Sequence, residues 1–84
     1  MNDATLLGLK PRALEIFNAL VAAYLESGQP IGSKTLAQRL RLDLSPASIR
    51  SPLRDLEAAG LLFSPHLSAG RVPTETGLRM FVDG

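Results

Sequence analysis

The stretch SKTLAQRLRLDLSPASIRSPLRDLEAAG, residues 33–60, decides how this chain folds. It contains two segments of helical pattern separated only by the four residues RLDL, so the two helices must pack closely. The second helix has a strong start, because Ser45 is an N-cap residue and Pro46, at the first helical position, has no N–H to satisfy. We expect it to end near Ala59, with Gly60 as the C′ residue. Two short helices joined by a tight turn predict a helix-turn-helix.

The first of these helices is expected to begin at Ser33, which can cap it. Its apolar residues share one face: Leu36, Ala37 and Leu40. In the turn that follows, Leu42 and Leu44 are predicted to point inward and close the space between the helices.

Upstream, residues 11–27 predict a longer helix with one buried face. Pro11 fits its first turn, and Gly28 supplies a left-handed stop. Apolar residues recur in it at three- and four-residue intervals: Leu14, Phe17, Leu20, Val21, Tyr24 and Leu25. The tripeptide Gln29-Pro30-Ile31 is expected to be extended and to add one short strand to a small sheet.

Downstream, an apolar run at residues 61–63, a polar loop and Val72-Pro73 predict a strand, a loop and a second strand, which together form a wing. Its tip is predicted to carry His66, Ser68 and Arg71, and Gly70 gives the loop conformational latitude. Thr74 can cap a last helix that Gly77 weakens by roughly 1 kcal/mol relative to alanine. The apolar residues of that helix are Leu78, Phe81 and Val82, and Met80 with Phe81 is its one candidate dimer face.

These elements predict a mainly α domain with a small β-hairpin, a winged helix-turn-helix with a three-helix core plus a wing. The 84 residues suffice for one small core. We expect the folded domain to span residues 9–84, after a flexible N-terminus at residues 1–8.

Composition excludes several function classes. The chain has no cysteine and one histidine, so neither a disulfide framework nor a thiolate or imidazole metal site is expected, and no cofactor is predicted. It has no apolar run near the roughly 20 residues that span a bilayer and no signal peptide, which favours a cytoplasmic protein. Asp55 and Glu57, two apart, diverge by about 200° on a helix and form no acid/base pair, so we expect no enzyme.

The net charge is only +1, but the charges are unevenly distributed. Residues 33–54 carry a surplus of cations over the single anion Asp43: Lys34, Arg39, Arg41, Arg50 and Arg54. Such a surplus suits contacts with phosphates, and it equally suits an ordinary solvated face. Charge alone does not decide between these interpretations.

Opposite its apolar residues Ile49, Leu53 and Leu56, the second helix of the pair presents a small, polar and cationic face. Such a face fits a major groove about 12 Å wide, where arginine pairs with guanine, serine donates or accepts, and alanine touches a thymine methyl. The predicted base-reading residues are Ala47, Ser48, Arg50, Ser51 and Arg54. The alternative is an ordinary surface on which Arg54 pairs with Asp55 or Glu57.

A second set of residues is predicted to contact the phosphate backbone, because the start of a helix favours anions. This set comprises Ser33, Lys34, Thr35, Arg39 and Ser45. A plain capping role for Ser33 is compatible with it. Arg71 on the wing is expected to lie over a minor groove or a phosphate, whereas His66 is interpreted as a solvated residue without a catalytic role.

Four ordered stretches resemble a known family: SGQPIGSKTLAQRL, LSPASIR, DLEAAGLL and PHLSAGRVPTETGLRMFVD, which lie between residues 27 and 83. They are similar to the N-terminal DNA-binding region of the HrcA heat-inducible transcription repressors, and the resemblance covers about residues 9–83. It implies a bacterial repressor of chaperone genes in the heat-shock stress response. It further implies that two copies bind an inverted-repeat operator on double-stranded DNA, the CIRCE element, at the nucleoid, and that the chaperonin system modulates them.

The chain departs from that family in two respects. Pro52 lies inside the second helix of the helix-turn-helix, the one predicted to read bases. There it removes the hydrogen bond to the Ser48 carbonyl, at a cost of about 3 kcal/mol, and we expect it to kink the helix. We therefore do not transfer the base contacts of the family to residues of this chain beyond Arg50. The chain also lacks the large C-terminal portion that dimerises and senses, so we expect one domain of a longer protein or a shortened relative. Pro52 and the low net charge leave open an alternative, a winged-helix module that binds proteins rather than DNA.

Overall fold

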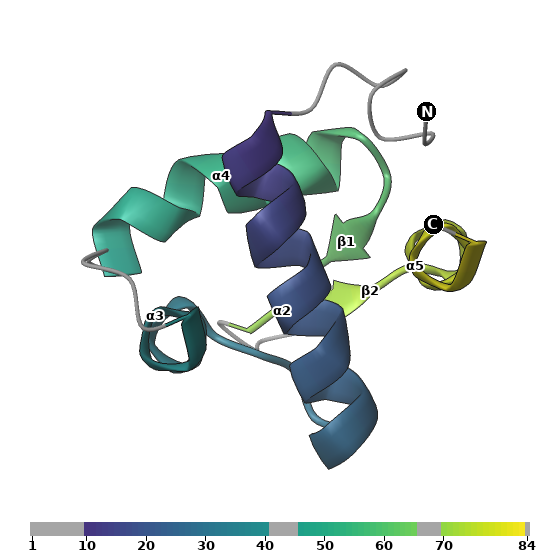
Figure 1. Ribbon diagram of the computed structural model, residues 1–84, viewed down its shortest axis with the longest axis horizontal. Coiled ribbons are helices and arrows are strands. Elements are labelled where there is room, and N and C mark those ends of the chain that lie inside the picture. The colour runs from purple at the N-terminus through teal and green to yellow at the C-terminus, as the bar shows by residue number, and fades with distance from the viewer. Residues whose placement is uncertain (1–9, 41–45, 66–69, 84) are drawn as a thin grey trace.

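A computed structural model describes residues 10–40, 46–65 and 70–83 of the chain (Figure 1). Its elements, in chain order, are α2 (Pro11–Ser27), α3 (Ser33–Leu40), α4 (Pro46–Ala58), β1 (Leu62–Phe63), β2 (Val72–Pro73) and α5 (Glu75–Asp83). This mostly helical winged helix confirms the predicted fold class. Several predictions fall outside the described residues: the flexible residues 1–8, the inward-pointing Leu42 and Leu44, the Ser45 cap, and the placement of His66 and Ser68.

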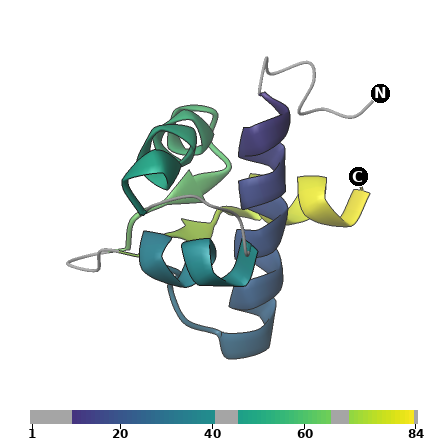
Figure 2. The ribbon, with the colours of Figure 1, turned by 60° about the vertical axis from the view of Figure 1, so that its left-hand side comes forward.

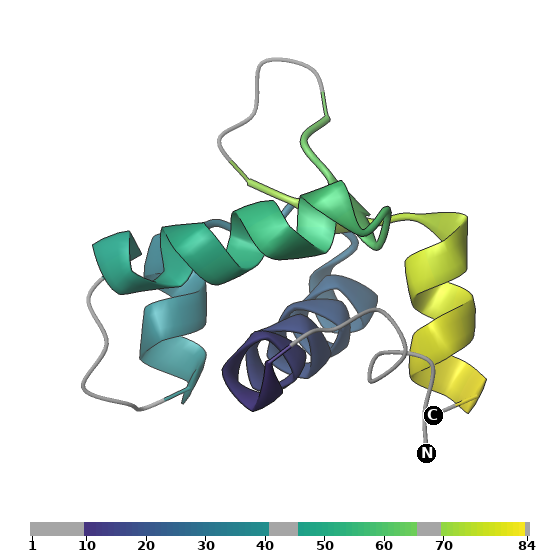
Figure 3. The same cartoon turned by 90° about the horizontal axis from the view of Figure 1, so that it is seen from above.

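The core is shared by the three helices α2, α3 and α4 and is closed by the hairpin. Figure 3 shows α3 and α5 at opposite ends of α4, with α2 between them. In Figure 2, α5 lies on the far side of α2 from α3 and α4. The largest fully buried side chains are aliphatic apart from one phenylalanine: Phe17, Ile16, Leu20, Leu36, Ile49, Leu56, Leu61 and Val21. Within the described residues no helix is long and apolar enough to cross a bilayer.

The ends of α2 are as predicted, with Pro11 in the first turn and Gly28 left-handed at φ 70°. The Gly28 N–H donates to the Tyr24 carbonyl at 2.7 Å. The predicted buried face is partly wrong, because Leu25 is 61% exposed and Leu14 is only partly buried. At about 100° per residue these two leucines lie more than a quarter turn from Leu20, at the centre of the buried stripe. The alanines Ala13 and Ala23 and the neighbouring Ile16 are buried instead.

The expected capping role of Ser33 is also wrong, because the helix α3 already includes this residue. The Gly32 carbonyl accepts the first helical hydrogen bond, from the Leu36 N–H at 3.1 Å, so Gly32 occupies the N-cap position. Glycine is tolerated there. The face of α3 formed by Leu36, Ala37 and Leu40 packs on the core as predicted.

The helix α4 ends in a Schellman motif. Gly60 is left-handed at φ 80°, its N–H donates to the Glu57 carbonyl at 3.0 Å, and the Leu61 N–H donates to the Leu56 carbonyl at 3.0 Å. This confirms the predicted boundary. The helix continues through Pro52 to Ala58, so this proline does not end it. The kink expected there stays a prediction.

The hairpin is antiparallel, with Leu62 opposite Pro73 and Phe63 opposite Val72. The extended segment before α3 joins it as predicted, because Ile31 and Arg71 exchange two backbone hydrogen bonds of 2.9 and 2.8 Å. The sheet is thereby tied to the loop that leads into α3.

Two glycines allow close packing around the hairpin, which their sequence context does not indicate. A Cβ on Gly77 would lie 2.3 Å from the Leu61 carbonyl oxygen, and one on Gly70 would lie 2.9 Å from the Pro30 Cβ. The expectation that Gly77 simply weakens the last helix therefore needs correction, since this glycine lets α5 approach the Leu61 backbone.

The predicted Thr74 cap is confirmed. Its Oγ1 accepts the Gly77 N–H at 3.0 Å and donates to the Gly60 carbonyl at 2.6 Å, so one hydroxyl joins α5 to the end of α4. Beyond this junction Leu78, Met80 and Phe81 pack partly against the core, while Val82 is 78% exposed.

Candidate nucleic-acid interface

The outer face of α4 has the geometry that the sequence predicts. Ile49, Leu53 and Leu56 are buried against the core. The side chains predicted to read bases are exposed where the structure describes them: Ser48, Arg50, Ser51 and Arg54. Ala47 lies in the first turn of the helix. The face is thus free of large apolar side chains.

The exposed residues of α4 divide between a front and a flank. At about 100° per residue, Ser51 and Ala58 lie opposite the buried stripe, so they form the front. Arg50 and Arg54 both lie on the side of Glu57, which we call the flank of α4, and Arg54 lies between Arg50 and the front. Both arginines line the same cleft on that side.

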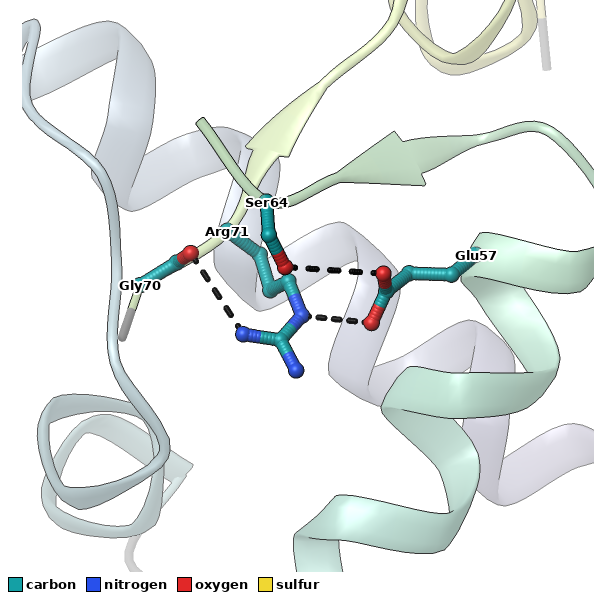
Figure 4. A network of polar contacts seen from close by, with 4 residues as sticks. All are labelled: Glu57, Ser64, Gly70 and Arg71. Atoms are coloured by element: carbon teal, nitrogen blue, oxygen red, sulfur yellow. Dashed lines mark hydrogen bonds and ion pairs between the residues drawn. The ribbon is translucent and has the colours of Figure 1, made fainter. Parts of the chain in front are cut away.

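The prediction that Arg71 lies at the tip of the wing is wrong. This residue lies at the base of the wing, where the hairpin meets α4. Its backbone pairs with Ile31, and its Nε donates to the Glu57 carboxylate of α4 at 2.6 Å (Figure 4). Ser64, on the other arm of the hairpin, donates to the same carboxylate at 3.5 Å, and Arg71 Nη1 donates to the Gly70 carbonyl at 3.4 Å. The reason is tertiary, because the hairpin folds back onto the last turn of α4.

Arg39 was predicted to contact a phosphate, but it pairs with Glu26 in the last turn of α2. Both terminal nitrogens of its guanidinium donate to the carboxylate, one of them at 3.2 Å. The hydrogen bond from Arg39, followed by the attraction of its charge, lowers the pKa of Glu26 below its ordinary value. The same hydrogen bond raises the pKa of Arg39. Arg39 thus ties α3 to α2.

The start of α3 keeps the features that favour an anion. Lys34 and Thr35 are exposed, and the first turn has no acidic residue. The first N–H groups of a helix have no partner within it, and the helix dipole makes this end positive. Ser45, the remaining member of the predicted phosphate set, lies outside the described residues, as do His66 and Ser68 of the wing.

A cleft of about 320 Å³ lies between the start of α3, the flank of α4 and the base of the wing. The cleft is lined by Ser33 of α3, by Arg50, Leu53 and Arg54 of α4, and by Arg71 at the base of the wing. The sequence places these residues in three separate elements. Their spacing in the sequence does not predict that these residues lie close together.

The alternative pairing of Arg54 with Glu57 is not found, because Glu57 pairs with Arg71. Across residues 10–40, 46–65 and 70–83, no ion pair involves Lys34, Arg50 or Arg54. The same residues hold no group of three or more His, Asp or Glu side chains placed to hold a metal ion.

Comparison with known proteins places this geometry in a family. The model of the ribonuclease R winged-helix domain matches residues 15–81. The resemblance to the heat-inducible transcription repressors HrcA is confirmed by high identities. The repressor of Erythrobacter litoralis is 70% identical over 90% of this chain, that of Sphingopyxis alaskensis 62% over 90%, and that of Novosphingobium aromaticivorans 58% over the whole chain.

This chain spans only about a quarter of the length of those relatives, 22 to 24% of each. A solved structure titled "Crystal structure of a hypothetical protein at 2.2 A resolution" is similar with a TM-score of 0.84 and 33% identity. The match covers 89% of this chain and 23% of that one. Fold and sequence comparisons therefore agree on a winged-helix domain.

Proposed function

The chain belongs to the winged-helix family described by the ribonuclease R winged-helix model, and we propose that it is the DNA-binding domain of a bacterial transcription repressor of the HrcA type. The observation that carries the proposal is the outer face of α4, which is small, polar and exposed and lies between the start of α3 and the base of the wing. The proposed role is binding, not catalysis.

In the proposed complex, α4 lies in the major groove with its front toward the bases. Ser51 is central on that front, and Ser48 is exposed beside it. We assign Ala47, in the first turn of α4, to the same contact. Short side chains let the helix backbone approach the base edges, where serine donates or accepts and alanine touches a thymine methyl. Lys34 and Thr35 at the start of α3 contact the backbone, and the wing lies along the adjacent groove.

Tight operator binding needs two copies of this domain. A single module of this size buries about 600–1,000 Å² on DNA, whereas dimers read two half-sites spaced by the helical repeat. Because the relatives are about four times longer than this chain, we assign dimerisation to the longer protein, along with any response to the chaperonin system. The proposed DNA is an inverted repeat, and the proposed location is the bacterial cytoplasm at the nucleoid.

The test is binding of the 84-residue chain to an inverted-repeat duplex of the CIRCE type, compared with the variant Ser51→Glu. A carboxylate at the centre of the front faces the DNA phosphates, so we expect affinity to fall by about tenfold or more. Thr76→Glu, on the exposed side of α5, adds the same charge away from the proposed interface. It should leave the dissociation constant within about twofold.

Two outcomes would contradict the proposal. Absence of binding by the unmodified chain at low salt would favour the protein-interaction alternative. Equal losses for Ser51→Glu and Thr76→Glu would show that charge, and not the front of α4, controls binding.

A further inference from the structure

The cleft between α3, α4 and the base of the wing has the shape and charge of an anion site. Its volume is about 320 Å³. Since a water molecule occupies roughly 30 Å³ in the liquid, the cleft has room for a tetrahedral oxyanion with several waters. Leu53, which is 3% exposed, closes it toward the core, so the polar walls surround an apolar wall.

The described charged side chains that line this cleft are cationic. Arg50 and Arg54 lie one turn apart on the same flank of α4, and neither is engaged in an ion pair within the described part of the chain. The third, Arg71, is balanced by Glu57. Among the described residues, therefore, no carboxylate forms an ion pair with either of these two positive charges. Guanidinium groups bind phosphates and carboxylates with paired hydrogen bonds, and of these two anions DNA carries the phosphate.

The wall formed by α3 contributes hydrogen-bond donors without charge. Ser33 is the first residue of the helix and lines the cleft. Its hydroxyl and the N–H groups of the first turn lie at the positive end of the helix dipole. A helix start alone does not make a site, but here it faces two arginines from another helix.

Resting on the function proposed above, we propose that this cleft binds one phosphate group of the DNA backbone, held by Arg50 and Arg54 and by the start of α3 at Ser33. The Arg71–Glu57 pair is a positioning element, because it holds the base of the wing against α4 and so sets the width of the cleft. This differs from the prediction that the two arginines read bases.

The consequence is a division of labour along α4. Phosphate contacts fix the register and orientation of a protein on the duplex and carry no direct sequence information. With both arginines on the backbone, base recognition falls to the short side chains of the front, chiefly Ser51. The domain then binds through charge on its flank and selects sequence through shape and serine contacts.

The experiment measures dissociation constants over a range of salt concentrations on two duplexes, the inverted repeat and a scrambled duplex of equal composition. The variants are Arg50→Gln and Arg54→Gln, which remove one charge and keep a polar side chain. We expect each to weaken binding by the same factor on both duplexes and to lower the salt slope by about one unit. Arg79→Gln on α5, whose arginine pairs with Glu75, is the matched control and should change neither.

A loss confined to the inverted repeat, with an unchanged salt slope, would overturn the proposal and return the arginines to base reading. If the unmodified chain binds neither duplex, the proposed function fails, and the cleft is then tested alone by NMR titration with inorganic phosphate. Saturable shifts of the Ser33 and Lys34 amides that disappear in the Arg50→Gln/Arg54→Gln double variant would support an anion site. Absence of such shifts in the unmodified chain would overturn it.

Discussion

The base of the hairpin and the corner between α2 and α3 are each closed by an arginine and a glutamate, but the two regions differ in burial. At the hairpin, Arg71 and Glu57 are 23% and 31% exposed, and Ser64 also donates to the carboxylate. At the corner, Arg39 and Glu26 are 37% and 64% exposed. Around the hairpin, backbones also approach closely at Gly70 and Gly77, a feature that the corner does not share.

This difference indicates what each pair can do. An exposed ion pair is screened by water and salt and contributes little to stability, whereas a partly buried pair with a further donor fixes geometry. We therefore interpret the hairpin base as the rigid junction that positions the wing on α4. The corner pair links α3 to α2 but is expected to contribute little to stability.

The largest expected effect comes from adding a methyl group at the tightest contact near the hairpin. Gly77→Ala places a Cβ 2.3 Å from the Leu61 carbonyl oxygen, so α5 must shift or the hairpin must move. We expect the free energy of unfolding, measured with urea, to fall by about 3 kcal/mol despite the better helix propensity of alanine. Thr76→Ala, next to it but exposed, is the control. An equal or higher stability for Gly77→Ala would show that this contact is loose.

A smaller effect is expected when the hairpin pair loses its charge. Glu57→Gln keeps an oxygen that can accept from Arg71, but leaves a half-buried guanidinium without its counter-charge. The free energy of unfolding should fall by about 1 kcal/mol. Glu75→Gln removes the partner of Arg79 in a pair that is almost fully exposed and should have no measurable effect. If both variants behave alike, partial burial does not increase the contribution of the hairpin pair to stability.

The smallest effect is expected at the corner, where a titration is more informative than a stability measurement. The pKa of Glu26, followed by NMR, should lie below its ordinary value because Arg39 binds the ionised form. Because the pKa of Glu26 is lower in the folded protein, the pair contributes to stability when the pH is above the ordinary pKa of a glutamate. This small contribution is lost as the pH falls through the lowered pKa. Arg39→Gln should return the pKa of Glu26 toward its ordinary value. An unchanged pKa in that variant would show that the pair does not persist in solution.

Much of the fold follows from local signals. Pro11 and Gly28 delimit α2, Gly60 ends α4, and Thr74 caps α5, because each acts on backbone groups within a few residues of itself. The buried residues of α4 were predicted from a period of 3.6 residues. The buried stripe of α2 was less accurate, since leucines occur on both sides of it and only packing decides which of them is covered.

The candidate site was less predictable than the fold. Spacing correctly predicts the exposed face of α4, yet nothing local distinguishes Arg50 and Arg54 from Arg39 and Arg71. The latter two pair with glutamates that lie 13 and 14 residues away in sequence. Such pairing depends on how helices and hairpin meet. The cleft, made from three elements, depends on it entirely.

By itself the sequence determined the helices, the hairpin, most of their boundaries and the helix-turn-helix order, because caps, turns and hydrophobic periods act over a few residues. Only the tertiary structure decided which arginines remain available for an anion and why Gly77 must be a glycine. Ion pairs and backbone contacts between distant elements depend on the positions of those elements in space, and these are set by the packing of the whole core.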